Sequence, residues 1–140
     1  MKEVFLALLS ALVWGTAPLI FKLGLRGEVP PLVGIFFHNL AAVLCASVSL
    51  LMLRESLQYP VRDIALISFG GFVSGFLGLL LYYKALKVGE VSVVAPIAAS
   101  SPLWASLFAF LLLGENFSLS KLVGTILIVS GVVILSLSKQ

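Results

Sequence analysis

Residues 78–115 read GLLLYYKALKVGEVSVVAPIAASSPLWASLFAFLLLGE, two apolar segments joined by a short charged turn. The charged side chains of the turn are Lys84, Lys87 and Glu90. This pattern is typical of a membrane protein, because the turn can lie among lipid headgroups while the apolar segments cross the hydrocarbon. Pro96 and Pro102 fall inside the second segment, where each proline frees backbone carbonyls. The stretch therefore predicts a bent transmembrane helix beside a cavity that accommodates the freed groups.

The composition of the whole chain indicates the same class. The 140 residues are 61% hydrophobic and 11% charged, and the mean hydropathy is +1.19, whereas soluble domains are about 45–50% apolar and about 25% charged. We expect one integral membrane domain over residues 1–140. The basic residues behind the net charge of +3 are scattered singly at segment ends. This distribution favours headgroup contacts over a nucleic-acid partner.

Five apolar segments can be counted, and their lengths fit the roughly 17–25 residues of a spanning helix. They cover residues 4–25, 31–53, 64–83, 91–113 and 122–137. The segments lack the alternation of a membrane β-barrel, and their short connections favour antiparallel neighbours. The first segment resembles a signal peptide but is long enough to span, so we interpret it as a retained helix. The predicted fold is an all-α membrane protein with five transmembrane helices.

The basic residues divide almost equally between the two membrane faces. The face that holds the N-terminus carries Lys2, Arg54, Arg62 and Lys121. The opposite face carries Lys22, Arg26, Lys84, Lys87 and Lys139. Since a clear excess of positive charge orients a membrane protein, four against five gives no preferred orientation. Either another feature fixes one orientation, or both orientations insert and two copies pair in an antiparallel dimer, as the two inverted repeats of many transporters do.

Small residues mark faces where helices can approach closely in lipid. The third segment carries Gly71, Gly75 and Gly78, and the fifth carries Gly124 and Gly131 on one face. We interpret these glycines, with the two prolines of the fourth segment, as structural residues. A dimer face on the fifth helix or a thin wall around a cavity is the functional alternative.

Polar and aromatic groups at membrane depth are the candidates for solute contact. The predicted cavity-lining residues are Trp14, Lys22, His38, Tyr82 and Ser100. Each also has an ordinary structural role available: lysines extend to headgroups, tyrosines form interfacial belts, histidines pack, and serines bond to their own helix. No Asp or Glu lies in the middle of a segment, which disfavours proton coupling through a buried carboxylate. No metal constellation, cofactor motif or catalytic set is present, so we expect neither an enzyme nor a cofactor.

Several motifs follow one another in a recognisable order. They are LVWG at 12–15 with Pro18 and FKLG at 21–24, YKAL at 83–86 with Gly89, Pro102 with Trp104, LLGE at 112–115, and Gly124 with Ile128 and Gly131. Over nearly its full length the chain resembles one EamA-type domain of the drug/metabolite transporter superfamily. The resemblance implies a transporter of small organic solutes with a cavity lined by the first, third and fourth helices. It also places Glu115 at the membrane interface as part of the family pattern.

Typical members of that superfamily carry two such domains, inverted and fused into ten helices, so this chain corresponds to half of a transporter. The missing half is expected from a second copy in an antiparallel homodimer or from a paired homologous subunit. We predict a multi-pass protein of the inner or plasma membrane, in contact with lipids, that exports a small metabolite by alternating access. The alternatives are a non-transporting subunit or scaffold that pairs with another membrane protein, and a flippase for a lipid or lipid carrier.

Overall fold

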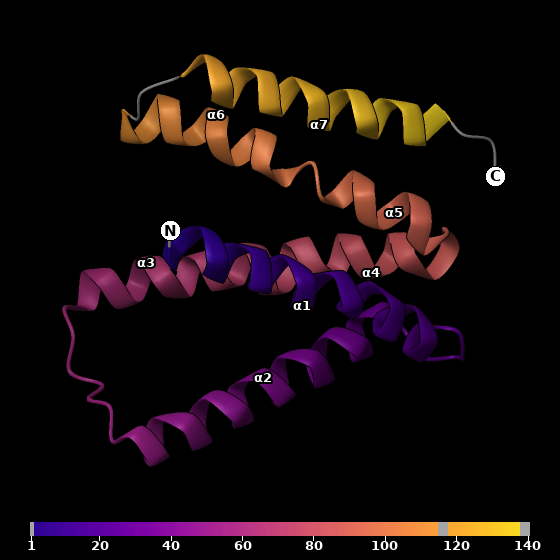
Figure 1. Ribbon diagram of the computed structural model, residues 1–140. Coiled ribbons are helices and arrows are strands. Elements are labelled where there is room, and N and C mark those ends of the chain that lie inside the picture. The colour runs from indigo at the N-terminus through magenta and orange to yellow at the C-terminus, as the bar shows by residue number, and fades with distance from the viewer. Residues whose placement is uncertain (1, 115–117, 138–140) are drawn as a thin grey trace. The chain divides into compact units, whose positions relative to one another are not determined.

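The computed structural model describes residues 2–114 and 118–137, which are helical apart from their connections. The elements are α1 (Lys2–Leu25), α2 (Pro31–Leu53), α3 (Val61–Gly71), the π-helical turn η1 (Phe72–Gly78), α4 (Leu79–Val88), α5 (Val91–Ala98), α6 (Ser101–Leu113) and α7 (Leu119–Leu137). Because α3, η1 and α4 are continuous and only a short turn separates α5 from α6, these elements form five helices within the described ranges (Figure 1).

The described helices include four that are long and apolar enough to cross a membrane, Lys2–Leu25, Pro31–Leu53, Val61–Val88 and Val91–Leu113, and a shorter apolar stretch, Leu122–Leu135. The prediction of an all-helical chain with five helices is therefore confirmed at this level. The third helix, Val61–Val88, extends beyond both ends of the predicted 64–83 and contains the π turn, which the apolar pattern does not predict.

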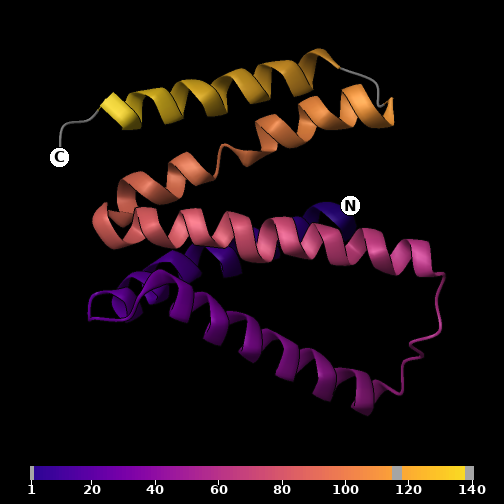
Figure 2. The ribbon, with the colours of Figure 1, turned by 180° about the vertical axis from the view of Figure 1, so that it is seen from behind.

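The chain divides into two compact units, Met1–Val88 and Gly89–Gln140. In the first unit, α4 packs against both α1 and α2, and α2 also contacts η1. The apolar core lies at this meeting point and consists of Leu25, Ile35, Tyr83 and Leu86. Figures 1 and 2 show that the N-terminal end of α2 lies close to α4. From there α2 diverges from α3 toward the connection at 54–60.

Most apolar side chains of the helices are exposed in the chain by itself. A soluble protein with such a surface would aggregate, whereas a membrane domain presents it to lipid tails. The few buried side chains therefore mark where this unit holds itself together, at the packed end of α1, α2 and α4.

The second unit contains the fourth helix in two pieces. A turn at residues 99–100 separates α5 from α6, and it lies between Pro96, inside α5, and Pro102, in the first turn of α6. The break thus occurs where the two prolines predict a bend. Helix α7 packs against both pieces. Helix α6 ends at Leu113 and is capped by Gly114, whose φ of +64° is a left-handed conformation that glycine adopts without strain.

Candidate solute-binding site

A buried tyrosine forms the centre of the polar site in the first unit. The hydroxyl of Tyr83 on α4 lies 3.0 Å from Nδ1 of His38 on α2. It accepts or donates according to which ring nitrogen carries the histidine proton. The ring of Phe21 on α1 lies 4.9 Å from the Tyr83 ring and 5.2 Å from the His38 ring, centroid to centroid. Three helices therefore meet through three rings, with a side-chain hydrogen bond among them.

Gly34 on α2 makes this close approach possible. A Cβ added at Gly34 would lie 3.1 Å from Cε2 of Tyr83, 3.2 Å from its Cδ2 and 3.5 Å from Cδ2 of Leu25. Any larger residue would meet the ring of Tyr83, a residue that is only 3% exposed. Because residue 34 is glycine, α2 can approach the Tyr83 ring of α4 this closely.

Two lysines link the ends of the helices around this cluster. Nζ of Lys22 on α1 donates to the carbonyl of Leu86 at 2.6 Å, in the last turn of α4, where carbonyls lack helical N–H partners and carry the negative end of the helix dipole. Nζ of Lys87 donates to the carbonyl of Val29, in the connection between α1 and α2, at 2.8 Å. Both bonds hold the same end of the unit together.

A third side-chain contact joins α2 to the π turn. Nδ2 of Asn39 donates to the carbonyl of Gly75 at 2.9 Å. In an α-helix the N–H of Leu79 would be that carbonyl's donor, but here it points to the carbonyls of Ser74 and Phe76. The Ser74 hydroxyl in turn donates to the carbonyl of Gly70 at 2.9 Å. The Asn39 amide therefore supplies a donor inside the irregular stretch, where lipid offers none. The Ser74 bond is of the i−4 kind that serines also make in the regular helices α2 and α7.

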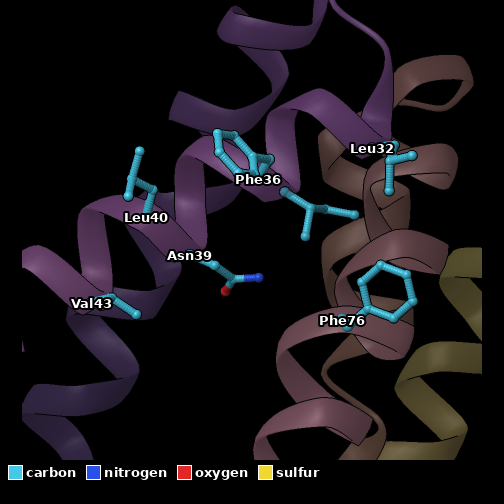
Figure 3. A pocket seen from close by; sticks show the side chains of 7 residues that line it. Leu32, Phe36, Asn39, Leu40, Val43 and Phe76 are labelled. Carbon is cyan, nitrogen blue, oxygen red and sulfur yellow. The ribbon is translucent and has the colours of Figure 1, made fainter.

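A groove of about 390 Å³ opens beside Asn39, between α2 and η1. Its lining residues are Leu32, Ile35, Phe36, Asn39, Leu40, Val43 and Phe76. Figure 3 shows the Asn39 amide projecting from α2 toward the helix that carries Phe76. Asn39 is the one polar side chain of the lining, so the groove is an apolar surface with a single amide beside it. A smaller hollow of about 250 Å³ lies within the second unit, between α6 and α7.

The structure brings together two of the five residues predicted to line a cavity. Lys22 and His38, on different helices, both contact α4. Trp14 lies on the exposed surface of α1, with 76% of its side chain accessible. Tyr82 is half-buried on α4, and Ser100, also half-buried, lies in the second unit at the turn between α5 and α6.

Three further residues at the site were not among the predicted cavity-lining residues: Phe21, Asn39 and Tyr83. The tyrosine against His38 is Tyr83, the neighbour of the predicted Tyr82. The spacing of Leu79, Tyr83 and Lys87 by four places them on one helical face. That periodicity does not choose between the two tyrosines, because Gly78, Tyr82 and Leu86 share a face in the same way.

The predicted structural glycines differ in their surroundings. A Cβ at Gly75 would lie 3.6 Å from Oδ1 of Asn39, and one at Gly78 would lie 3.4 Å from the carbonyl of Val73. A Cβ at Gly71, Gly124 or Gly131 would meet no atom of the described residues within 4 Å, neighbouring backbone excluded. Glu115 lies outside the described residues. Within the described ranges, no group of three His, Cys, Asp or Glu side chains could hold a metal ion.

Comparison with known families agrees with this architecture. A family model, the EamA-like transporter family, matches residues 1–137. The chain belongs to the EamA-like transporter family. With its four long apolar helices, it is a multi-pass membrane protein of that family. No solved structure matches the chain significantly.

The relatives of this chain differ in length. An uncharacterized protein of Methanocaldococcus jannaschii is 28% identical, and the match covers 96% of each chain. The uncharacterized transporter YdfC of Bacillus subtilis is 27% identical over 89% of this chain but only 40% of its own length. An uncharacterized transporter of Archaeoglobus fulgidus is 24% identical over 96% of this chain and 48% of its own. The chain thus spans about half of the two curated transporters and nearly all of the shorter relative.

Proposed function

We propose that the chain forms half of a membrane transporter for a small organic solute and that two oppositely oriented halves enclose the solute pathway. The observation that carries this proposal is the cluster of Lys22, His38 and Tyr83 where three apolar helices meet. Polar side chains within membrane helices are costly and usually mark a solute or ion pathway. Membership of a transporter family supports the same interpretation and favours a transporter over an enzyme.

The pairing of two halves rests on two observations. The basic residues are balanced between the predicted membrane faces, so neither orientation is favoured by charge. The curated transporters from B. subtilis and A. fulgidus match this chain over 40% and 48% of their lengths, which is the share that one of two repeats would occupy. The second half is then another copy of this chain or a homologous subunit, and the two rock around a central site by alternating access.

The proposed pathway is lined by the residues predicted from the sequence: Trp14, Lys22, His38, Tyr82 and Ser100. Lys22 can bind an anionic group of the solute in exchange for its bond to the α4 carbonyl. Trp14 and Tyr82 can stack on an aromatic or cationic group. We propose export as the direction, from the inner or plasma membrane outward.

Ligand-induced stabilisation tests this proposal with a panel of candidate solutes. The purified protein in lipid nanodiscs is heated with amino acids, amines, nucleosides and organic acids in turn. A solute at 100 times its Kd stabilises the folded state by about 2.7 kcal/mol, so a clear rise in Tm is expected. His38→Ala should abolish that rise. Lys84→Met, at an exposed position on α4, is the matched control and should keep it.

Flux in proteoliposomes must accompany any such stabilisation. If no compound of the panel is bound or moved by the wild-type protein, transport of a small solute is refuted. If only a co-purifying membrane protein raises the Tm of the chain, the alternative of a non-transporting scaffold subunit is favoured.

The orientation of the two halves can be measured separately. Paired reporters, each active on only one side of the membrane, are fused to the C-terminus. Activity of both reporters is expected if this chain inserts both ways and supplies both halves. Activity of one alone excludes the antiparallel homodimer and leaves a homologous subunit of opposite orientation as the partner.

The apolar groove beside Asn39 favours one second candidate, a flippase for an amphipathic lipid. Six of its seven lining residues are apolar, as a groove for an acyl chain requires. Liposomes with fluorescent phospholipid distinguish the candidates: a flippase makes inner-leaflet lipid accessible to a membrane-impermeant quencher, whereas a solute transporter leaves it protected.

A further inference from the structure

The π turn η1 changes how the two halves of the third helix face their neighbours. A π turn accommodates one residue more than α-helical geometry does, and one residue corresponds to about 100° of rotation. If the turn became α-helical with every residue retained, α3 would therefore rotate relative to α4, or one would shift along the other. Because α4 is held by the contacts of Tyr83 and Leu86, α3 is the part free to move.

The packing of the unit leaves α3 room for that movement. Among the described residues, α3 makes extensive contacts only with η1, its own continuation, whereas α4 packs against both α1 and α2. Figures 1 and 2 show α2 and α3 far apart where the connection at 54–60 joins them. The stretch also contains Gly70, Gly71, Gly75 and Gly78, and glycine favours the regular α-helix least among residues other than proline.

One interhelical contact stabilises the π form. The bond from Asn39 Nδ2 to the Gly75 carbonyl supplies the donor that Leu79 N–H would supply in an α-helix. In the α form that carbonyl has its own partner, and the asparagine amide is released toward the groove. The same side chain thus senses the geometry of η1 and lines the groove with Phe76, a residue of η1 itself.

We propose that Asn39 is a positioning residue of the transport cycle: its amide holds η1 in π geometry, and its release lets η1 become α-helical, moves α3 relative to α2 and reshapes the groove. The assignment to a transport cycle rests on the proposed function. The coupling between Asn39 and the geometry of η1 rests on the contacts alone.

Removal of the extra residue tests the coupling. In the deletion variant ΔVal73, η1 can form a regular α-helix with both α3 and α4 unmoved, and the Gly75 carbonyl regains a backbone donor. In the wild-type background, Asn39→Ala should lower the ratio of folded to unfolded protein by about 3-fold to 20-fold, the range for single interhelical hydrogen bonds in membranes. In the ΔVal73 background the same substitution should have almost no effect.

A deletion outside the π turn provides the matched control. In ΔLeu66, within α3, the π turn remains, so Asn39→Ala should cost as much as in the wild type. An equal cost of Asn39→Ala in the ΔVal73 and ΔLeu66 backgrounds would overturn the proposed coupling.

Distance measurements test the movement, and the chain supplies one of the two labels. Cys45 on α2 is the sole cysteine and is exposed. A second label is placed on α3 with Ile67→Cys, at a side chain that is 72% exposed. Spin-label distances in liposomes are compared for the wild-type, Asn39→Ala and ΔVal73 backgrounds. We expect Asn39→Ala to add a second distance, whose population rises by about 3-fold to 20-fold over that in the wild type. ΔVal73 removes the extra residue together with the π turn, so it should keep the wild-type distance.

Two results would overturn the proposal: wild-type populations in Asn39→Ala, or the second distance appearing equally in the double variant of Asn39→Ala and ΔVal73. Flux in the same liposomes separates this test from that of the proposed function. Wild-type liposomes that move no solute refute transport, whatever the distances show. If α3 moves in Asn39→Ala but ΔVal73, which has no π turn to lose, transports solute as fast as the wild type, the role of Asn39 in the cycle is refuted.

Discussion

Replacement of Gly34 by alanine tests the close packing on which the candidate site depends. The new Cβ would lie 3.1 Å and 3.2 Å from two ring carbons of Tyr83, tighter than ordinary van der Waals contact. The ring cannot easily move away, because Phe21 packs against it and His38 holds its hydroxyl. The substitution must therefore separate α2 from α4 or displace the hydrogen-bonded ring.

The expected magnitude follows from two opposed effects. Alanine is favoured over glycine inside a helix by about 0.5–1 kcal/mol, whereas one extra methyl group in a well-packed site costs about 1–3 kcal/mol. Gly34→Ala should thus lower the free energy of unfolding by up to about 2.5 kcal/mol. Gly15→Ala on α1 is the control, because a Cβ there meets no atom of the described residues within 4 Å. Gly15→Ala should therefore raise the free energy of unfolding by up to about 1 kcal/mol.

The comparison of these two alanine variants isolates the packing cost, since both replace a glycine within a helix. Equilibrium unfolding in mixed detergent micelles, followed by far-UV circular dichroism, should separate them by about 1–3 kcal/mol. If Gly34→Ala is as stable as Gly15→Ala, the ring of Tyr83 does not lie against α2, and the packing of the three rings is wrong.

Three further substitutions test individual contacts. Tyr83→Phe removes the hydroxyl that bonds to the histidine on α2 and should cost about 0.6–1.7 kcal/mol in the same unfolding assay, whereas Tyr82→Phe should cost less. Lys22→Met leaves a carbonyl in the last turn of α4 without its lysine donor and should lower stability by about 1–3 kcal/mol, while Lys84→Met, at an exposed position, should change it by less than about 0.5 kcal/mol. Gly131→Leu meets open space among the described residues, so it should leave folding intact and reduce dimer formation in crosslinking experiments if α7 pairs with a second copy.

Apolar run length and proline position were sufficient to predict the helices and the break in the fourth of them. Both depend on local chemistry: about 20 apolar residues span a bilayer, and a proline removes a helical donor wherever it lies. The turn between α5 and α6 at residues 99–100 accordingly falls between the two prolines. The π turn could not be predicted in this way, because its carbonyl at Gly75 depends on an amide from a different helix.

The candidate site shows the same limit. Lys22 and His38 stand out in the sequence because charge and imidazole are rare in apolar segments, and the structure brings both to α4. The choice between adjacent tyrosines depends instead on the rotation of α4. That rotation is set by packing around Gly34 and Leu86, which are remote in sequence from each other.

The polar contacts of the first unit fall into two kinds, and the difference identifies the groups best suited to bind a solute. Lys22, Lys87 and Asn39 each donate to a backbone carbonyl at a helix end, a connection or the π turn. These three contacts also stabilise the fold, because such carbonyls need donors in lipid. The bond between His38 and Tyr83 joins two side chains and satisfies no backbone group. Since an apolar pair of similar size could fill that space without the cost of burying polar atoms, the histidine and tyrosine are the members of the cluster that stability alone does not explain.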